Sequence, residues 1–165
     1  MRAIQLCIIL LVGSAQAFAA ANGSQLHGHW KITGIAGAQD TTSLSSDQAD
    51  LLAGSILDIG ADSIGFNGET CHQPSLTVSR HNKQRFFRRE FNFDPIGMPL
   101  PDIVTEFRID CKNPSPIHFI YVRDKRQILF YWKGFFLNAV KERSAPATST
   151  PAPAPARSDG CPAAC

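Results

Sequence analysis

The sequence has no excess of charge of either sign and little charge in total. Sixteen Lys and Arg residues stand against fourteen Asp and Glu residues, for a formal net charge of +2. A balance of this kind produces no strong field for a nucleic acid. Beyond the N-terminal segment, no apolar run approaches the roughly 20 residues that a membrane-spanning helix requires. The sequence therefore predicts a protein that neither binds nucleic acid nor spans a membrane.

Motifs of the common enzyme classes are also missing. There is no nucleophile elbow, no glycine loop for a phosphate and no zincin helix. The carboxylates Asp58, Asp62, Glu69 and Asp110 are scattered, so no pair of them is indicated for acid–base catalysis. Because catalytic triads are recognised in space and not by position, this lowers the odds of catalysis without excluding it. We expect a protein that is not an enzyme and has no cofactor.

The N-terminus has the three-part layout of a secretory signal peptide. An apolar run over 4–12 follows a short basic start, and the small residues of 17–21 come next, so cleavage is expected after Ala19 or Ala21. Residues 1–21 are therefore predicted to be removed. An exported protein of the bacterial periplasm is the expectation.

The C-terminal segment differs in composition from the rest of the chain. Residues 145–156 are all Ala, Pro, Ser or Thr and cannot bury a core. We predict a disordered tail over 144–165, after one domain over 22–143. For the tail cysteines Cys161 and Cys165, a local or intermolecular disulfide is favoured over a soft-metal or thiol-exchange site, because no helix N-terminus is there to stabilise a thiolate.

Export changes how the cysteines of the mature chain are interpreted. Cys71, Cys111, Cys161 and Cys165 are an even number in an oxidising compartment, and they permit three pairings. We favour a disulfide between Cys71 and Cys111, because both lie in the structured body. Closing this loop of about 40 residues should stabilise the fold by on the order of 4 kcal/mol.

Short runs of β-branched and aromatic residues, divided by polar breaks, predict antiparallel strands. The clearest set is a meander over 117–122, 127–132 and 135–141, and Asn67-Gly68 is the strongest hairpin signal. Residues 103–111 alternate, with Phe107, Ile109 and Cys111 on the core side and Val104, Glu106 and Arg108 on the other. Further strands are predicted over 27–35, 55–59, 63–66, 69–71 and 75–79.

One short helix interrupts the strands. Ser45 and Gln48 have the spacing of a capping box, which predicts a helix over 46–53 that Gly54 ends. Residues 80–93 are predicted to form one or two irregular strands. About eight strands with turn signals every eight to twelve residues are typical of an antiparallel barrel or sandwich.

The start of the mature chain carries a family resemblance. Gly28 and Trp30 form a Gly-x-Trp motif, and with the meander this resembles the entry of lipocalin-like barrels. The chain is also similar to small periplasmic proteobacterial proteins of unassigned function. META-domain proteins and the barrel-type inhibitors of secreted proteases share the outline. The other matching residues are Leu52-Ala53-Gly54, Ala61-Asp62, the hairpin and Cys over 66–71, and the apolar hairpin over 132–136. The resemblance implies an eight-stranded lipocalin-like β-barrel and brings no catalytic residue with it.

Cations and aromatic rings are interleaved over residues 80–93. A solvated strand pair over a Phe-filled core is slightly favoured, but the same pattern could dock an acidic protein, a lipid head group or a cell-wall polymer. The candidate binding residues are Arg80, Lys83, Arg85, Phe87, Arg88 and Arg89.

Two histidines near the domain entrance are a weaker candidate. His27 and His29 would share one face of a strand and could chelate a metal. His72 and His118 are distant in sequence, so a third ligand is missing. Two exposed histidines are the favoured interpretation, and we predict no metal site.

These observations lead to three functional hypotheses. The first is a periplasmic, non-enzymatic binding protein that recognises a protein of the cell envelope, such as an inhibitor or modulator of a secreted enzyme. The second is a carrier of a small apolar ligand inside the barrel, since an eight-stranded barrel can enclose one small molecule. The third is an envelope structural protein that is cross-linked through its tail cysteines.

Overall fold

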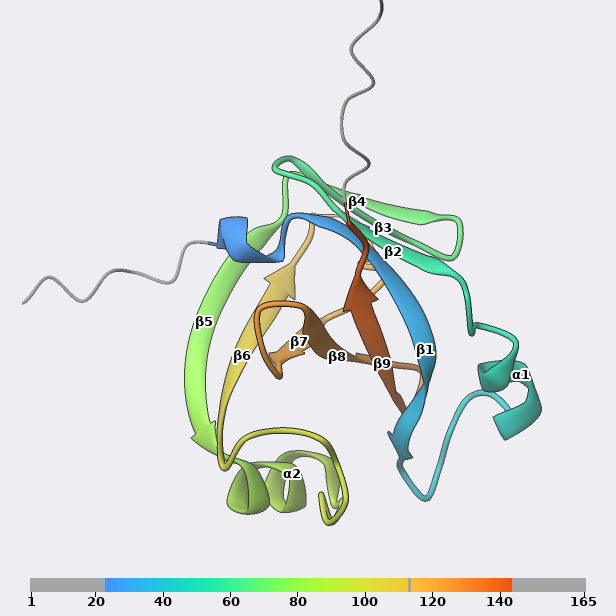
Figure 1. The fold of residues 1–165 in the computed structure, drawn as a ribbon, viewed down its shortest axis with the longest axis vertical. Helices are drawn as coiled ribbons and strands as arrows, with labels where there is room; N and C mark the ends of the chain where they lie inside the picture. Colours follow the sequence, from blue (N-terminus) through green and yellow to red (C-terminus); the bar gives the residue numbers. More distant parts are fainter. Residues whose placement is uncertain (1–22, 113, 144–165) are drawn as a thin grey trace, which may run out of the picture.

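The computed structural model describes residues 23–112 and 114–143, which form one antiparallel sheet of nine strands that curls into a half-barrel (Figure 1). The strands lie in the order β4-β3-β2-β1-β9-β8-β7-β6-β5. The predicted fold class is confirmed, with nine strands in place of about eight. The strands are β1 (Gly28–Ala38), β2 (Ile56–Ile59), β3 (Ser63–Phe66), β4 (Glu69–His72), β5 (Ser75–Asn82), β6 (Ile103–Asp110), β7 (Phe119–Val122), β8 (Gln127–Trp132) and β9 (Phe135–Lys141).

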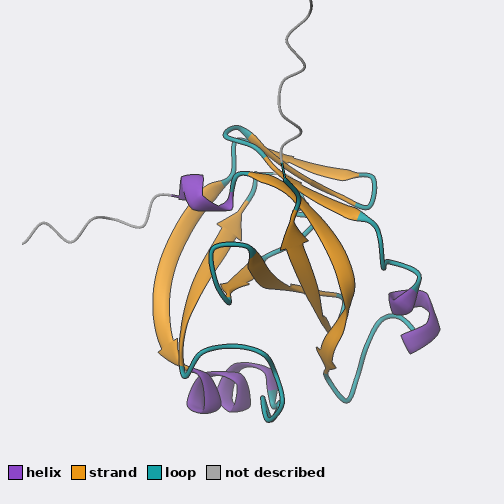
Figure 2. Cartoon of the chain, viewed as in Figure 1, coloured by secondary structure: helices purple, strands orange, loops and turns teal. Residues whose placement is uncertain are grey.

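Short helical segments lie around the rim of the sheet (Figure 2). They are the 3-10 helix η1 (Gly23–Leu26) and the α-helices α1 (Ser46–Asp50) and α2 (Lys83–Phe91). Within the described ranges, no helix is long and apolar enough to cross a membrane. The predicted signal peptide and the predicted tail lie outside the described residues.

Local sequence signals account for the tight turns. Asn67 and Gly68 both have positive φ, at 50° and 81°, and they join β3 to β4. Lys133 and Gly134 repeat this pattern between β8 and β9, with φ of 49° and 94°. Two-residue turns with positive φ match the right-handed twist of the strands. Both predicted hairpins are therefore confirmed.

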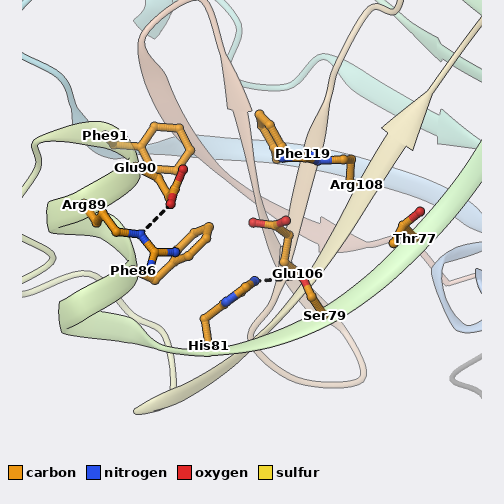
Figure 3. A pocket seen from close by; sticks show the side chains of 10 residues that line it. All are labelled: Thr77, Ser79, His81, Phe86, Arg89, Glu90, Phe91, Glu106, Arg108 and Phe119. Carbon is orange, nitrogen blue, oxygen red and sulfur yellow. Dashed lines mark hydrogen bonds and ion pairs between the residues drawn. The ribbon is translucent and has the colours of Figure 1, made fainter.

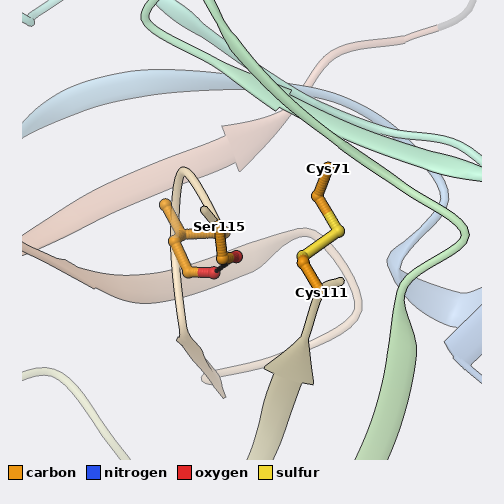
Figure 4. Close-up of a disulfide and its surroundings, with 4 residues drawn as sticks. Cys71, Cys111 and Ser115 are labelled. Carbon is orange, nitrogen blue, oxygen red and sulfur yellow. Dashed lines mark hydrogen bonds between the residues drawn. A yellow bond between two sulfur atoms is a disulfide. The ribbon is translucent and has the colours of Figure 1, made fainter. Parts of the chain in front are cut away.

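A disulfide ties the two ends of the sheet together. The edge strands β4 and β5 are separated in sequence only by Gln73 and Pro74, but no ladder of the described sheet joins them. Cys71 of β4 forms a disulfide with Cys111, which directly follows β6, at a Cα–Cα distance of 5.8 Å (Figure 4). The half-barrel is thus closed at one corner by a covalent link and not by a ninth ladder.

The concave face of the sheet holds the larger hydrophobic cluster. Trp30, Phe66, Phe107 and Phe130 are almost fully buried in it, and the rings of Phe66 and Phe130 meet edge to face at 5.2 Å. The Trp30 indole donates to the Leu26 carbonyl at 2.6 Å, so its buried N–H has a partner. Large side chains fill the inside of the half-barrel.

A second cluster lies on the opposite, outer face of β6 to β9. Residues alternate between the two faces of a strand: Phe107, in register with Ile120, belongs to the concave cluster, whereas Tyr121 and Leu129 belong to the outer one. Phe87 of α2 is fully buried there. Both faces of these strands are therefore covered.

The helix α2 corrects the prediction of irregular strands over 80–93. Asn82 caps it, because its side chain accepts a hydrogen bond from the Arg85 amide, and Asn92 ends it in the left-handed conformation. Phe87 and Phe91 are four residues apart and share one face of the helix. The run was misread because clustered Phe residues are compatible with both periods, and the helical period of the pair was overlooked.

The prediction of which β6 residues face the core was also partly wrong. Val104 and Glu106 were predicted to face away from the core, yet both are buried, because α2 and the following loop cover the outer face. Val78 lies on the edge strand β5 and is 37% exposed. The capping box of Ser45 and Gln48 is present, although α1 ends earlier than predicted.

Candidate functional site

A groove of about 380 Å³ lies between α2 and the outer face of β5, β6 and β7 (Figure 3). Alternation along β5 puts Thr77, Ser79 and His81 on one face, and the ladder sets Ser79 opposite Glu106 and Thr77 opposite Arg108. The groove is lined by Thr77, Ser79, His81, Phe86, Arg89, Glu90, Phe91, Glu106, Arg108 and Phe119.

Glu106 is the unusual residue of this groove. It is only 5% exposed, and among the described residues it is the one charged side chain that is buried. Its Oε2 atom has no hydrogen-bond partner among them. Burial raises the pKa of the Glu106 carboxyl, and the nearby charges of His81 and Arg108 partly oppose this rise. A buried carboxylate oxygen without a partner is costly, so its presence calls for an explanation.

Tyr121 stands beside Glu106 on the neighbouring strand β7. Its hydroxyl is also buried and has no hydrogen-bond partner among the described residues. Burial, followed by the nearby Glu106 charge, raises the pKa of the Tyr121 hydroxyl. Tyr121 therefore stays neutral, and two adjacent strands each bury a polar atom without a partner on the same face.

His81 forms a fixed polar wall of the groove. Its Nε2 atom lies 2.8 Å from the Ser79 hydroxyl, and its ring stacks on Phe86 with centroids 4.2 Å apart. Ser, His and Glu are the residue types of a catalytic triad, but no described hydrogen bond joins Glu106 to the Nδ1 atom of His81. In a triad, that contact orients the imidazole.

Two arginines complete the groove. The Arg108 guanidinium lies over the Phe119 ring, 5.4 Å from its centroid. Arg89 donates through Nε to Glu90 at 2.7 Å, so these two charges neutralise each other at the rim. Arg108 is in no ion pair with any of the described residues. Its guanidinium is therefore unpaired among these residues, and the Phe119 ring holds it in place.

A second, smaller hollow of about 210 Å³ adjoins the groove. We call it the basic hollow, because three of its six lining residues are arginines. It is lined by Arg80, His81, Asn82, Arg85, Phe86 and Arg89. His81, Phe86 and Arg89 belong to both depressions. The basic hollow and the groove thus form one continuous surface around the start of α2.

Only half of the binding residues predicted from the sequence meet at this surface. Arg80, Arg85 and Arg89 line the basic hollow. Phe87 is fully buried in the outer cluster, where its ring meets Phe136 at 5.3 Å. It is a core residue and does not contribute to a binding surface.

Lys83 and Arg88 are occupied by contacts within the protein. Lys83 donates from Nζ to the Leu100 carbonyl at 3.0 Å and so anchors the loop that follows α2. Arg88 donates to Asp94 at 2.6 Å, and this bond lowers the pKa of the Asp94 carboxyl. Both cations hold the 92–102 loop against the helix.

Gly28 and Trp30, the residues predicted at the barrel entry, lie among contacts that support the fold. Gly28 has a φ of 133°, a conformation that favours glycine, and Trp30 is 1% exposed. The Lys141 ammonium lies 5.2 Å from the Trp30 ring. His29 contacts Asp58, with 3.4 Å between Nδ1 and Oδ2, and both side chains are more than half exposed. Within the described ranges, no three His, Cys, Asp or Glu residues lie close enough to hold a metal ion.

The sequence interpretation missed the floor of the groove. Ser79, Glu106, Arg108 and Phe119 were not among the candidates, although Arg108 and Glu106 share a face of the most regular predicted strand. The Asn82 cap with the Phe87 and Phe91 spacing could have indicated a helix after β5. A helix there must cover a sheet face, which would have turned the outward residues of β6 into candidate site residues.

The chain was compared with protein-family models, with curated proteins and with solved structures, and none of them matches it.

Proposed function

We propose that the protein is a non-enzymatic binding protein of the bacterial periplasm that recognises an acidic surface of an envelope protein through the basic hollow. The observation that carries this proposal is the gathering of Arg80, Arg85 and Arg89 around one depression. Arg80 and Arg85 are in no ion pair with any described residue. Guanidinium groups recognise carboxylates in a bidentate geometry, so this surface is complementary to an acidic patch.

The surroundings of the hollow support a recognition role. Phe86 and His81 both line the hollow, and the 7% exposed Phe86 is held by the stacked His81 ring. Interfaces depend on such rigid aromatic and arginine anchors more than on area. Binding there would block a partner sterically, which is the action expected of an inhibitor or modulator of an envelope enzyme.

The concave side favours surface recognition over the carrier hypothesis. A carrier needs an open apolar cavity of a few hundred cubic ångströms. Trp30, Phe107 and Phe130 occupy the inside of the half-barrel and are 0–1% exposed. Native mass spectrometry of the mature protein from its own periplasm checks this: a small mass that is lost on denaturation would favour the carrier.

The proposal is tested by reversing the charges of the hollow. A variant with Arg80, Arg85 and Arg89 changed to Glu is compared with the wild type in capture of a partner by cross-linking, followed by affinity measurement with the purified partner. We expect a loss of at least tenfold, because removing anchors at the centre of an interface typically costs about 2 kcal/mol or more.

A matched control carries the same number of reversals away from the site. Changing Arg123, Lys125 and Arg143 to Glu alters the net charge equally and touches neither depression. This variant should bind the partner as the wild type does. Equal losses of affinity in both variants would show that the effect comes from net charge alone. No loss of affinity in the hollow variant would overturn the proposal.

A further inference from the structure

Glu106 and Arg108 carry opposite charges on one face of β6 and do not pair with each other. They are two residues apart, so their Cα atoms are separated by roughly 6.5–7 Å along the strand. No ion pair within 4.0 Å joins them. Arg108 lies over Phe119, and the Oε2 atom of Glu106 has no partner among the described residues. The groove therefore presents a carboxylate and a guanidinium that are separate from each other.

The groove also has aromatic walls and a defined size, beside its polar residues Thr77, Ser79 and His81. Phe86, Phe91 and Phe119 contribute rings to its walls. A volume of about 380 Å³ is in the range of sites that hold small molecules. Rings beside a carboxylate also suit a cationic group, which is attracted to the face of an aromatic ring.

We infer that the groove binds a small zwitterion with an apolar side chain, such as a free α-amino acid. Its ammonium group would donate to the Glu106 carboxylate, which lines the groove, and its carboxylate would accept from the Arg108 guanidinium. The two hydrogen bonds, each near 2.8 Å, together with the short distance between the two charges of an α-amino acid, suit a pair of side chains at this spacing.

The charge balance of the groove favours a zwitterion over a simple cation or anion. Arg89 and Glu90 at the rim already neutralise each other. A bound cation alone would satisfy Glu106 but would face the Arg108 charge. An anion alone would leave the buried carboxylate without a donor and close to a second negative charge. Only a ligand with both charges satisfies both groups.

The test uses three probes with the same phenyl body and different charges: L-phenylalanine, phenethylamine and 3-phenylpropionate. Each is titrated into the mature chain and followed by amide chemical shifts and by calorimetry. We expect L-phenylalanine to bind at least tenfold more tightly than either of the other probes. The largest shift changes should occur at Ser79, Glu106 and Arg108.

Single variants assign the two contacts. Glu106→Gln should remove the advantage of L-phenylalanine over 3-phenylpropionate, and Arg108→Gln should remove its advantage over phenethylamine. Arg123→Gln is the matched control, because Arg123 is exposed and lines neither depression. It should leave all three affinities unchanged.

Each other outcome overturns the inference. Phenethylamine that binds as tightly as L-phenylalanine would exclude a carboxylate contact, and equal binding of all three probes would reduce the groove to an apolar slot. Absence of binding by all three, with a wild-type fold in the amide spectrum, would exclude the site. The inference goes beyond the proposed envelope partner and does not depend on it, because Glu106→Gln leaves Arg80, Arg85 and Arg89 in place.

Discussion

The two faces of the sheet over β6 to β9 are both buried, but they bury different chemistry. The concave face holds Trp30, Phe107 and Phe130 in a cluster with no charged member, next to the disulfide. The outer face also packs aromatic rings, but it includes Glu106 and the Tyr121 hydroxyl, each with a polar atom that has no described partner. The concave face is therefore purely apolar, whereas the outer face buries polar atoms without partners at a cost in stability.

The largest effect should come from the concave face. Phe130→Ala removes a fully buried ring and leaves a cavity, so the free energy of unfolding should fall by about 3–5 kcal/mol. Guanidinium unfolding measures the loss. Ile96→Ala is the control, because Ile96 is 78% exposed and its removal should change little. A loss below about 1 kcal/mol for Phe130→Ala would show that the concave face is not close-packed.

The disulfide should contribute nearly as much. Replacing Cys71 and Cys111 together by Ser opens a loop of 40 residues, and the free energy of unfolding should fall by about 4 kcal/mol in the chain-entropy model. The same denaturation experiment on the double variant measures it. Affinity for L-phenylalanine under native conditions should be retained, because both cysteines lie outside the groove. Loss of L-phenylalanine binding in a folded double variant would contradict the separation between the concave face, which stabilises the fold, and the groove on the outer face.

Glu106→Gln should act in the opposite direction and stabilise the protein. The substitution removes a buried charge and keeps the side-chain shape, so the free energy of unfolding at pH 8 should rise by about 1 kcal/mol. Urea unfolding of the variant and the wild type measures this difference. Glu90→Gln is the control, because Glu90 is partly exposed at the rim and paired with Arg89. A clear loss of stability for Glu106→Gln would mean that Glu106 has a structural role.

The pH dependence of that difference follows from the pKa of Glu106. Burial raises the pKa in the folded state above the ordinary value of 4.5, so the folded protein holds this proton more tightly than the unfolded chain. Stability therefore falls as the pH rises from 4.5 through the raised pKa. His81, Arg108 and Glu90 also act on this carboxyl, so the comparison is made as variant minus wild type. The advantage of Glu106→Gln should grow over this window and vanish below it.

The smallest effects should come from the N-caps of the two α-helices. Asn82→Ala removes the cap of α2 and Ser45→Ala removes the cap of α1, and each should cost about 0.5–1 kcal/mol. Thermal unfolding compares these losses. Only Asn82→Ala should also weaken binding of L-phenylalanine, because α2 forms a wall of the groove and α1 does not. Equal effects of the two substitutions on binding would show that α2 does not need its cap to shape the site.

Signals confined to a few neighbouring residues predicted much of the fold. Asn67-Gly68 and Lys133-Gly134 set two hairpins, and the Ser45 and Gln48 pair set the start of α1. The basic and aromatic run after β5 was predicted only as a candidate binding segment, and its helix was missed. Four of its six candidates, namely Lys83, Phe87, Arg88 and Arg89, proved to have contacts within the protein, since a sequence does not show which side chains find a partner.

The amino-acid sequence by itself determined the strands, the tight turns and the Cys71–Cys111 pairing, because these depend on local backbone preferences and on two cysteines in one structured body. Only the tertiary structure decided that α2 covers the outer face. Alternation places Glu106 and Arg108 on that face but does not say whether water or a helix lies over it. Their burial, and with it the groove, arises when α2 packs against a sheet that is already covered on its other side.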